Sequence, residues 1–246
     1  MKIASAQIEV KVGDIENNLK KHLQTIEVVS KHNVDLIVFP EMSLSGYCRE
    51  EALNLSFKEH DARLLSLKEI SSNHNITIIV GAPILIKQNL HIGSFIFQPN
   101  NSSLIYTKQF LHKGEDLFFV SSFNYNPILN IKQSKISFAI CADINNKQHA
   151  ENAFKNDCDI YIPSIFFSEN GIEDGHGILS SYSKKYNFNT LMSNFCGKHW
   201  NINSAGRSAF WDRKGEKLSE LTTNKEELLI AEKVSDHNWV TKNIQL

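Results

Sequence analysis

A glutamate, a lysine and a cysteine stand where apolar or aromatic segments of this chain end. Glu41 closes one apolar segment, Lys108 follows an aromatic residue and a threonine, and Cys141 closes a second apolar segment. A carboxylate can act as a general base, an ammonium group can stabilise a developing oxyanion, and a thiol is a soft nucleophile. These are the groups needed to open an amide-like carbon-nitrogen bond through a thioester. The sequence therefore predicts a cysteine hydrolase.

Each of these groups has a step in such a reaction. A free thiol with a pKa of about 8.5 is only a few per cent thiolate at neutral pH, so Cys141 needs a base or a cation nearby. Glu41 would take the thiol proton, pass it to the leaving amine, and then activate the water that cleaves the thioester. Lys108 and the backbone N–H of Ala142 would stabilise the oxyanion, where losing one donor costs on the order of 3 kcal/mol of barrier.

Taken singly, the same residues have ordinary explanations. A glutamate after Pro40 is typical of a solvated helix start, a lysine after an aromatic strand is typical of a surface charge, and a strand cysteine is typical of a packed side chain. The catalytic interpretation depends on their occurring together and in order.

Hydrophobic periodicity predicts alternating strands and helices that would position these residues. Nearly continuous apolar runs at 34–39 and 76–82 predict central strands. A helix capped by Asp14 and ended by Asn33 lies before the first of them. Further strands are expected at 2–7, 93–98, 103–108, 127–131, 135–141, 159–164, 190–194, 205–212 and 228–234, and further helices over 148–156, over 176–187 and around Leu64, Leu67 and Ile70.

This order of elements predicts two sheets packed face to face with helices outside, in one domain over residues 1–246. The successive strands between 92 and 142 predict the antiparallel part of a sheet. Because ligands of open α/β sheets bind at the carboxyl ends of strands, one pocket is expected to collect Glu41, Cys141 and Phe166, with Lys108 at the end of a fourth strand.

Composition predicts an ordinary soluble protein with a small-molecule partner. The 246 residues are 41% hydrophobic and 22% charged, and 26 Lys and Arg against 27 Asp and Glu leave a net charge of -1. We therefore expect no general attraction to nucleic acid or to acidic lipid. Glu9 interrupts the start of the chain where a secretory segment would be apolar, and no apolar run approaches the ~20 residues of a membrane span. A cytoplasmic location is expected.

The cysteines do not form a metal or disulfide pattern. Cys48, Cys141, Cys158 and Cys196 are widely separated, which predicts free thiols in a reducing compartment. Cys196 and His199 form a C-x-x-H half-site without a second pair nearby. The sequence predicts neither a metal nor an organic cofactor.

The segments around these residues resemble those of the nitrilase or carbon-nitrogen hydrolase superfamily, whose members use a Glu-Lys-Cys catalytic triad. The resemblance is carried by FPEMSLSGY (39–47), YTKQFLHKGEDLFF (106–119) and AICADI (139–144), and it continues through YIPSIFF, MSNFCG and SAGRSAFWDRKGEKL. It implies that Glu41, Lys108 and Cys141 are catalytic, that Glu115 takes the place of a second glutamate with Asp116 as the competing carboxylate, and that Tyr47 lines the acyl pocket.

The resemblance also implies a fold and an assembly. The implied fold is a four-layer α-β-β-α sandwich of two mixed sheets, and the implied assembly is a homodimer through outer helices. LHKGED and AICAD resemble the small bacterial amidase-like branch more closely than they resemble true nitrilases. This chain departs from many relatives after the nucleophile and at Phe166, where tryptophan is frequent, and His112 lies within the lysine segment. Tyr47, His112, Ala142 and Phe166 are therefore candidates for substrate binding.

The predicted function is hydrolysis of a small carboxamide with water as second substrate. A nitrile or an N-carbamoyl amine could react at the same cysteine, and acyl transfer to another nucleophile is open as well. A glutaminase that feeds a partner synthetase and a catalytically idle binding protein on the same fold are further alternatives. A substrate with a carboxylate would need a cation in the pocket, for which Arg49, Lys113 and Arg207 are candidates.

Overall fold

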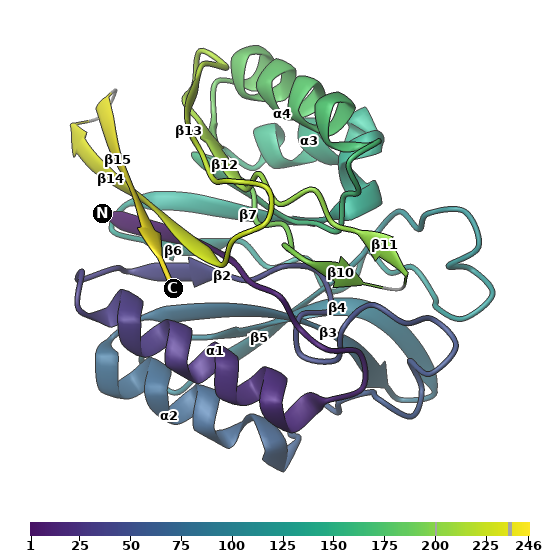
Figure 1. Ribbon diagram of the computed structural model, residues 1–246. Coiled ribbons are helices and arrows are strands. Elements are labelled where there is room, and N and C mark those ends of the chain that lie inside the picture. Colours follow the sequence, from purple (N-terminus) through teal and green to yellow (C-terminus); the bar gives the residue numbers. More distant parts are fainter. Residues whose placement is uncertain (200, 236–237) are drawn as a thin grey trace.

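Two β-sheets face each other between two pairs of helices in the computed structural model, which describes residues 1–199, 201–235 and 238–246 (Figure 1). The first sheet contains β1 (Lys2–Gln7), β2 (Leu36–Val38), β3 (Thr77–Ile86), β4 (Asn89–Phe97), β5 (Ser103–Thr107), β14 (Glu227–Ser235) and β15 (Asn238–Gln245), in the order β15-β14-β1-β2-β3-β4-β5. Strands β1, β2 and β3 are parallel, and the remaining neighbours pair antiparallel.

The second sheet contains six strands. These are β6 (Leu129–Ile131), β7 (Ser134–Ile140), β8 (Ile160–Ser164), β9 (Asn189–Leu191), β12 (Ala209–Trp211) and β13 (Lys217–Glu220), in the order β13-β12-β9-β8-β7-β6. Parallel pairing joins β7 to β8 and β8 to β9, and antiparallel pairing completes the sheet at both edges. A separate two-stranded ribbon is formed by β10 (Lys198–His199) and β11 (Ile202–Asn203).

Two α-helices cover the outer face of each sheet (Figure 1). Helices α1 (Ile15–Ser30) and α2 (Leu65–His74) lie on the seven-stranded sheet, and α3 (Lys147–Lys155) and α4 (Ile172–Tyr186) lie on the six-stranded sheet. Asp14 caps α1 by accepting a hydrogen bond from the backbone N–H of Asn17. Short 3₁₀ helices, η1 (Ala62–Leu64) and η2 (Cys141–Asn145), precede α2 and α3. In the described part of the chain, no helix is both long and apolar enough to cross a bilayer.

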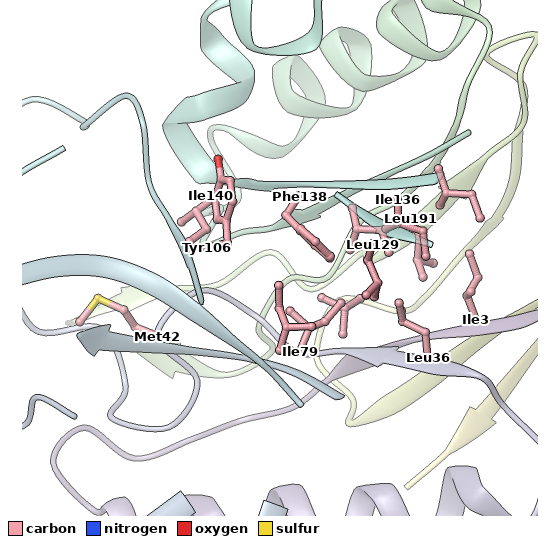
Figure 2. Close-up of a cluster of buried hydrophobic side chains, with 14 of the residues drawn as sticks. Ile3, Leu36, Met42, Ile79, Tyr106, Leu129, Ile136, Phe138, Ile140 and Leu191 are labelled. Atoms are coloured by element: carbon pink, nitrogen blue, oxygen red, sulfur yellow. The ribbon is translucent and has the colours of Figure 1, made fainter. Parts of the chain in front are cut away.

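The central core lies between the two sheets, where strand side chains from both inner faces meet (Figure 2). Apolar side chains from the first sheet meet those of the second in a cluster that includes Ile3, Leu36, Ile79, Ile136, Phe138, Ile140 and Leu191, and all of these are at most 2% exposed. Burying one such side chain contributes about 1.5–3 kcal/mol. The sheets that carry the candidate residues are thereby held rigidly against each other.

The predicted fold class is confirmed, and so is the central position of the strands expected at 34–39 and 76–82. One prediction about the sheets was wrong. The stretch from 92 to 142 does not supply one antiparallel region, because β4 and β5 lie in the first sheet whereas β6 and β7 lie in the second. The segment between β5 and β6 carries the chain from one sheet to the other, which periodicity within strands cannot reveal.

Candidate active site

Glu41, Lys108 and Cys141 lie just beyond the carboxyl ends of strands from both sheets. Glu41 follows β2 after two residues, Lys108 directly follows β5, and Cys141 directly follows β7. Phe166 lies two residues beyond β8, the parallel neighbour of β7. Because the two sheets are packed face to face, these strand ends meet, and the predicted convergence is observed.

The backbone turns sharply at two of these positions. Cys141 has a φ of 42° and Met42, next to Glu41, has a φ of 53°, both in the left-handed region that non-glycine residues seldom occupy. Such conformations cost about 1–3 kcal/mol each and persist only where surrounding packing holds them. At Cys141 the turn ends the strand and begins η2, which leaves the thiol partly exposed at the pocket.

The Lys108 ammonium group lies between two carboxylates in the interior. Its Nζ is 2.8 Å from Glu41 Oε1 and 2.9 Å from Glu115 Oε1, and all three residues are 1% exposed. Charges this deeply buried are stable only when they are paired and hydrogen-bonded. Glu115, and not Asp116, occupies the second carboxylate position; Asp116 is exposed and accepts a hydrogen bond from the backbone N–H of Gly114.

Burial shifts the pKa values of Glu41, Lys108 and Cys141. Removal from water raises the pKa of Glu41 to about 7, although the positive charge of Lys108 opposes the shift. Burial also lowers the pKa of Lys108, but the surrounding negative charges outweigh it and the net shift is upward. Burial, with the Glu41 carboxylate, raises the pKa of the Cys141 thiol well above its usual range. In the resting site Lys108 is thus charged and the sulfur is protonated.

A pocket of about 220 Å³ opens above these groups. Its walls consist of Glu41, Tyr47, Arg49, His112, Glu115, Cys141, Phe166, Ser168 and Ile202. This volume is below the roughly 300–1,000 Å³ typical of sites for drug-sized ligands. A larger hollow of about 450 Å³ lies elsewhere, along Lys58, His60, Lys87 and Tyr125, but it contains none of the candidate catalytic residues. The smaller pocket is the candidate active site.

Glu115 has its oxygens occupied by donors. Oε1 accepts hydrogen bonds from Lys108 Nζ at 2.9 Å and from the Tyr47 hydroxyl at 2.8 Å, and Oε2 accepts one from the backbone N–H of His112 at 2.7 Å. The Tyr47 hydroxyl itself accepts a hydrogen bond from Arg49 Nε at 2.8 Å. Since a guanidinium group can only donate, the hydroxyl proton points to Glu115.

Three of the four predicted substrate-binding residues line the pocket with their side chains, and Ala142 does not. The Tyr47 and Phe166 rings both line it, with centroids 5.2 Å apart, and the exposed His112 lies at its edge. The Ala142 methyl group is buried outside the wall. Its backbone N–H lies in the first turn of η2, where N–H groups have no partner within a helix. Ala142 can therefore contact a substrate through its N–H, as predicted for the oxyanion, but not through its side chain.

Asp143 joins the lysine segment to the cysteine segment, a role that the sequence analysis missed. Its Oδ1 accepts hydrogen bonds from the backbone N–H groups of Gln109 and Phe110, and its Oδ2 accepts them from the backbone N–H of Ile140 and the Tyr106 hydroxyl. The residue is fully buried. An aspartate two positions after a candidate nucleophile was the only available signal, since its partners are mostly backbone groups that leave no trace in sequence.

The other candidate residues lie away from this pocket or have structural contacts. Arg207 forms ion pairs with Glu173 and Glu220, and the Cys196 carbonyl oxygen accepts a hydrogen bond from His199 Nε2. Across the ranges that the structure describes, no three His, Cys, Asp or Glu side chains are grouped to hold a metal ion. Ser168 and Ile202 also line the pocket, and neither was predicted from the sequence. Ile202 belongs to the short β10–β11 ribbon, which was not among the expected strands.

Comparisons with known proteins give matches to a family model and to individual relatives. The family model described as "Carbon-nitrogen hydrolase" matches residues 2–236. The chain is 28% identical over 160 residues to the glutamine-dependent NAD(+) synthetase of Thermotoga maritima, an alignment that covers 59% of this chain and 26% of the synthetase. It is also 28% identical over 160 residues to the protein N-terminal amidase of Schizosaccharomyces pombe, covering 59% of this chain and 56% of that protein. The aligned region thus spans about a quarter of the first relative and about half of the second.

The fold has close structural neighbours. The amidase from Nesterenkonia sp. AN1, solved as an active-site mutant in complex with butyramide, superimposes with a TM-score of 0.83 at 19% sequence identity. The match covers 94% of this chain and 89% of that chain. At this identity the likeness establishes the shared α/β architecture of two mixed sheets and four helices.

Proposed function

The chain belongs to the carbon-nitrogen hydrolase family, and from this premise we propose that it hydrolyses a small carboxamide through a thioester on Cys141. The observation that carries the proposal is the buried Glu41–Lys108–Glu115 cluster, which meets the Cys141 thiol at the floor of one small pocket. The volume of about 220 Å³ favours a short acyl group.

In the proposed first step, Cys141 Sγ attacks the amide carbon. The thiol pKa is raised while that of Glu41 is about 7, so the proton stays on sulfur until attack begins and passes to Glu41 as the carbon-sulfur bond forms. Lys108 Nζ and the Ala142 N–H stabilise the negative charge on the carbonyl oxygen. Glu41 then gives its proton to the leaving nitrogen, the carbon-nitrogen bond breaks, and ammonia or an amine departs.

Water completes the proposed cycle. Glu41, again a carboxylate, takes a proton from the water that adds to the thioester carbon, and the carbon-sulfur bond breaks as the proton returns to sulfur. The products are a carboxylic acid and the free thiol. In both halves of the reaction the same residue moves the proton, which is efficient because its pKa lies near neutral pH.

The two glutamates have different parts in this mechanism. Glu115 already accepts three hydrogen bonds, one of them from Lys108 Nζ, so its oxygens are committed to holding Lys108 in place. Glu41 shares Lys108 and lines the same pocket as the Cys141 thiol, which places it in the path of the proton. We assign the base to Glu41 and the anchoring of Lys108 to Glu115.

The comparisons support this chemistry. The Nesterenkonia amidase is described in complex with butyramide, and a glutamate-to-leucine mutant of it is described with the acetamide moiety of fluoroacetamide added covalently at the active-site cysteine. Similarity to glutamine-dependent NAD(+) synthetases favours glutamine hydrolysis as a second candidate. A nitrile or a carbamoyl amine would use the same residues, and a homodimer through the outer helices remains part of the proposal.

The test is ammonia release from a panel of aliphatic amides, ω-amides, carbamoyl amines and nitriles. Cys141→Ala should reduce turnover of whichever substrate is found by at least about 10³-fold, because no other group supplies the nucleophile. Cys158→Ala, which removes a buried thiol elsewhere in the protein, is the matched control and should retain activity. Unchanged turnover in Cys141→Ala would refute the mechanism. If only binding is found with every compound, the idle-protein alternative is correct.

A further inference from the structure

Arg49 brings a positive charge to the wall of the candidate active site. Of the described residues that line the pocket, it is the one lysine or arginine. It lies on the segment after β2 that also carries Glu41 and Tyr47, and it is half-buried. The cations Lys113 and Arg207, which the sequence offered as alternatives, are not in the pocket wall.

The position of the Arg49 guanidinium is built by several contacts. Nε donates to the Tyr47 hydroxyl at 2.8 Å and Nη1 donates to the Lys113 carbonyl at 3.3 Å. Gly114, at a φ of +84°, makes room for this approach, since a Cβ there would lie 3.0 Å from Nη1. The guanidinium is therefore held against the segment that carries Glu115.

The charges around the pocket give this arginine a consequence for binding. The carboxylates of Glu41 and Glu115 are only half balanced by Lys108, so the pocket would be negative without Arg49 and would repel an anionic substrate. Arg49 brings the sum of these four charges to zero and places a positive charge in the pocket wall. A guanidinium group matches the planar, two-oxygen geometry of a carboxylate better than a lysine does.

We infer that the substrate is an amide that carries a carboxylate, recognised by Arg49 while the amide carbon lies at Cys141. This inference rests on the proposed function and narrows it from carboxamides in general to monoamides of short dicarboxylic acids and related amide-acids. The small volume of the pocket limits the spacer between the two groups to a few carbons. Arg49 is a specificity-determining residue in this account.

Succinamate and succinamide form the probe pair, because they have the same shape and differ in the charge of one end. At about pH 8 the wild-type protein should have a kcat/KM for succinamate at least about tenfold higher than for succinamide, mainly through KM, as expected for one charge-assisted pair. Malonamate and glutaramate then define the spacer. In Arg49→Gln the preference should fall to about one or below, and Arg49→Lys should retain part of it.

Two further measurements separate recognition from support of Tyr47. Tyr47→Phe removes one of the contacts that position Arg49 but keeps the cation, so it should lower both rates and still leave most of the preference for succinamate in place. In a Cys141→Ala background, calorimetry should show that succinamate binding weakens at least about tenfold on adding Arg49→Gln. This readout does not depend on turnover.

The outcomes are distinguishable. If the wild-type protein has the same kcat/KM for succinamide as for succinamate, the inference is overturned and the proposed function still stands. An equal loss for both amides in Arg49→Gln, with unchanged succinamate binding, also overturns it and makes Arg49 a support for Tyr47. A protein that hydrolyses no amide in the series contradicts the proposed function and the inference together.

Discussion

A carboxylate buried against an ammonium group sets the acid-base behaviour of the pocket. Glu41 is 1% exposed, and its pKa is raised to about 7 mainly by burial. The pairing with Lys108 keeps that pKa from rising further, since an opposite charge at 2.8 Å favours the ionised form. The balance of the two effects makes the residue suited to move protons near neutral pH.

The pH dependence of turnover tests this balance. The proposed base works only as a carboxylate, so kcat/KM should rise with pH and level off above about 7, the pKa of Glu41. Glu41→Gln should abolish this rise of kcat/KM with pH, together with nearly all activity. The measurement is a kcat/KM profile between about pH 5 and 9 with a neutral amide. A limb near the ordinary glutamate value of about 4.3 would contradict the role assigned to burial.

Removing Lys108 tests the charge cluster through stability. Lys108→Met leaves the buried carboxylates without their cation, and we expect the free energy of unfolding to fall by about 3–5 kcal/mol. Without Lys108 the pKa of Glu41 rises further above its unfolded value. The free energy of unfolding of Lys108→Met should therefore be higher at about pH 5, where Glu41 is protonated, and should fall as pH rises.

Denaturant unfolding at about pH 5 and 8 provides the measurement for Lys108→Met. The control is Lys135→Met, which breaks the exposed Lys135–Asp157 ion pair and should cost no more than about 1 kcal/mol at either pH. Equal, small losses in both variants would show that the buried cluster is not charged as described.

At the scale of elements, β3 positions the turn that carries Glu41. Gly81 of β3 lies so close to this turn that a Cβ would collide with the backbone N of Met42 and lie 2.6 Å from the Pro40 carbonyl oxygen. The backbone N–H of Leu44 also donates to the Gly81 carbonyl at 3.0 Å. The left-handed conformation at Met42 is thereby supported from the neighbouring strand.

Gly81→Ala should therefore displace Glu41 from Lys108. We expect a destabilisation of about 1–3 kcal/mol, as for overpacked sites, and a fall of kcat/KM of about tenfold or more, since small displacements of catalytic groups are costly. The matched control is Gly177→Ala in α4, where nothing lies within 4 Å, and it should stabilise the protein by about 0.5–1 kcal/mol. If both variants behave alike in both assays, β3 does not position the turn.

The elements that were predictable from sequence are those with strong periodicity or apolar runs. The strands around 36–38 and 77–86 and the helix capped by Asp14 follow from their own residues. Helix α4 begins at Ile172 rather than at 176, because Gly175 and Gly177 in its first turns mask the helical pattern. Strand β15 was missed because it is an edge strand with mostly exposed polar residues.

The candidate site was predictable to the extent that strand ends and short motifs mark it. Glu41, Lys108, Glu115 and Cys141 were all named from sequence, and the structure brings them together. The placement of Arg49 in the wall depends on contacts to Tyr47 and to a backbone carbonyl, which no local pattern encodes.

At the scale of the whole molecule, the predicted dimer can be located by two exposed aromatic residues. Phe154 of α3 is 53% exposed and Phe123, in the segment before β6, is 56% exposed. If the protein dimerises through its outer helices, Phe154→Lys should shift it toward monomer, since a charge there would be buried, whereas Phe123→Lys should leave the dimer intact. Sedimentation velocity over a range of concentrations gives the answer. If Phe123→Lys and not Phe154→Lys disrupts the dimer, the interface lies at the segment before β6. If the wild-type protein is a monomer, the predicted dimer is wrong.

A covalent acyl group on Cys141 is the intermediate on which the proposed mechanism depends, and it can be detected by mass spectrometry of the protein quenched in acid during amide turnover. We expect a mass increase equal to the acyl group, located on the peptide that contains Cys141 and absent from Cys141→Ala. Turnover at full rate with the Cys141 peptide unmodified, and with Cys141→Ala equally active, would contradict it.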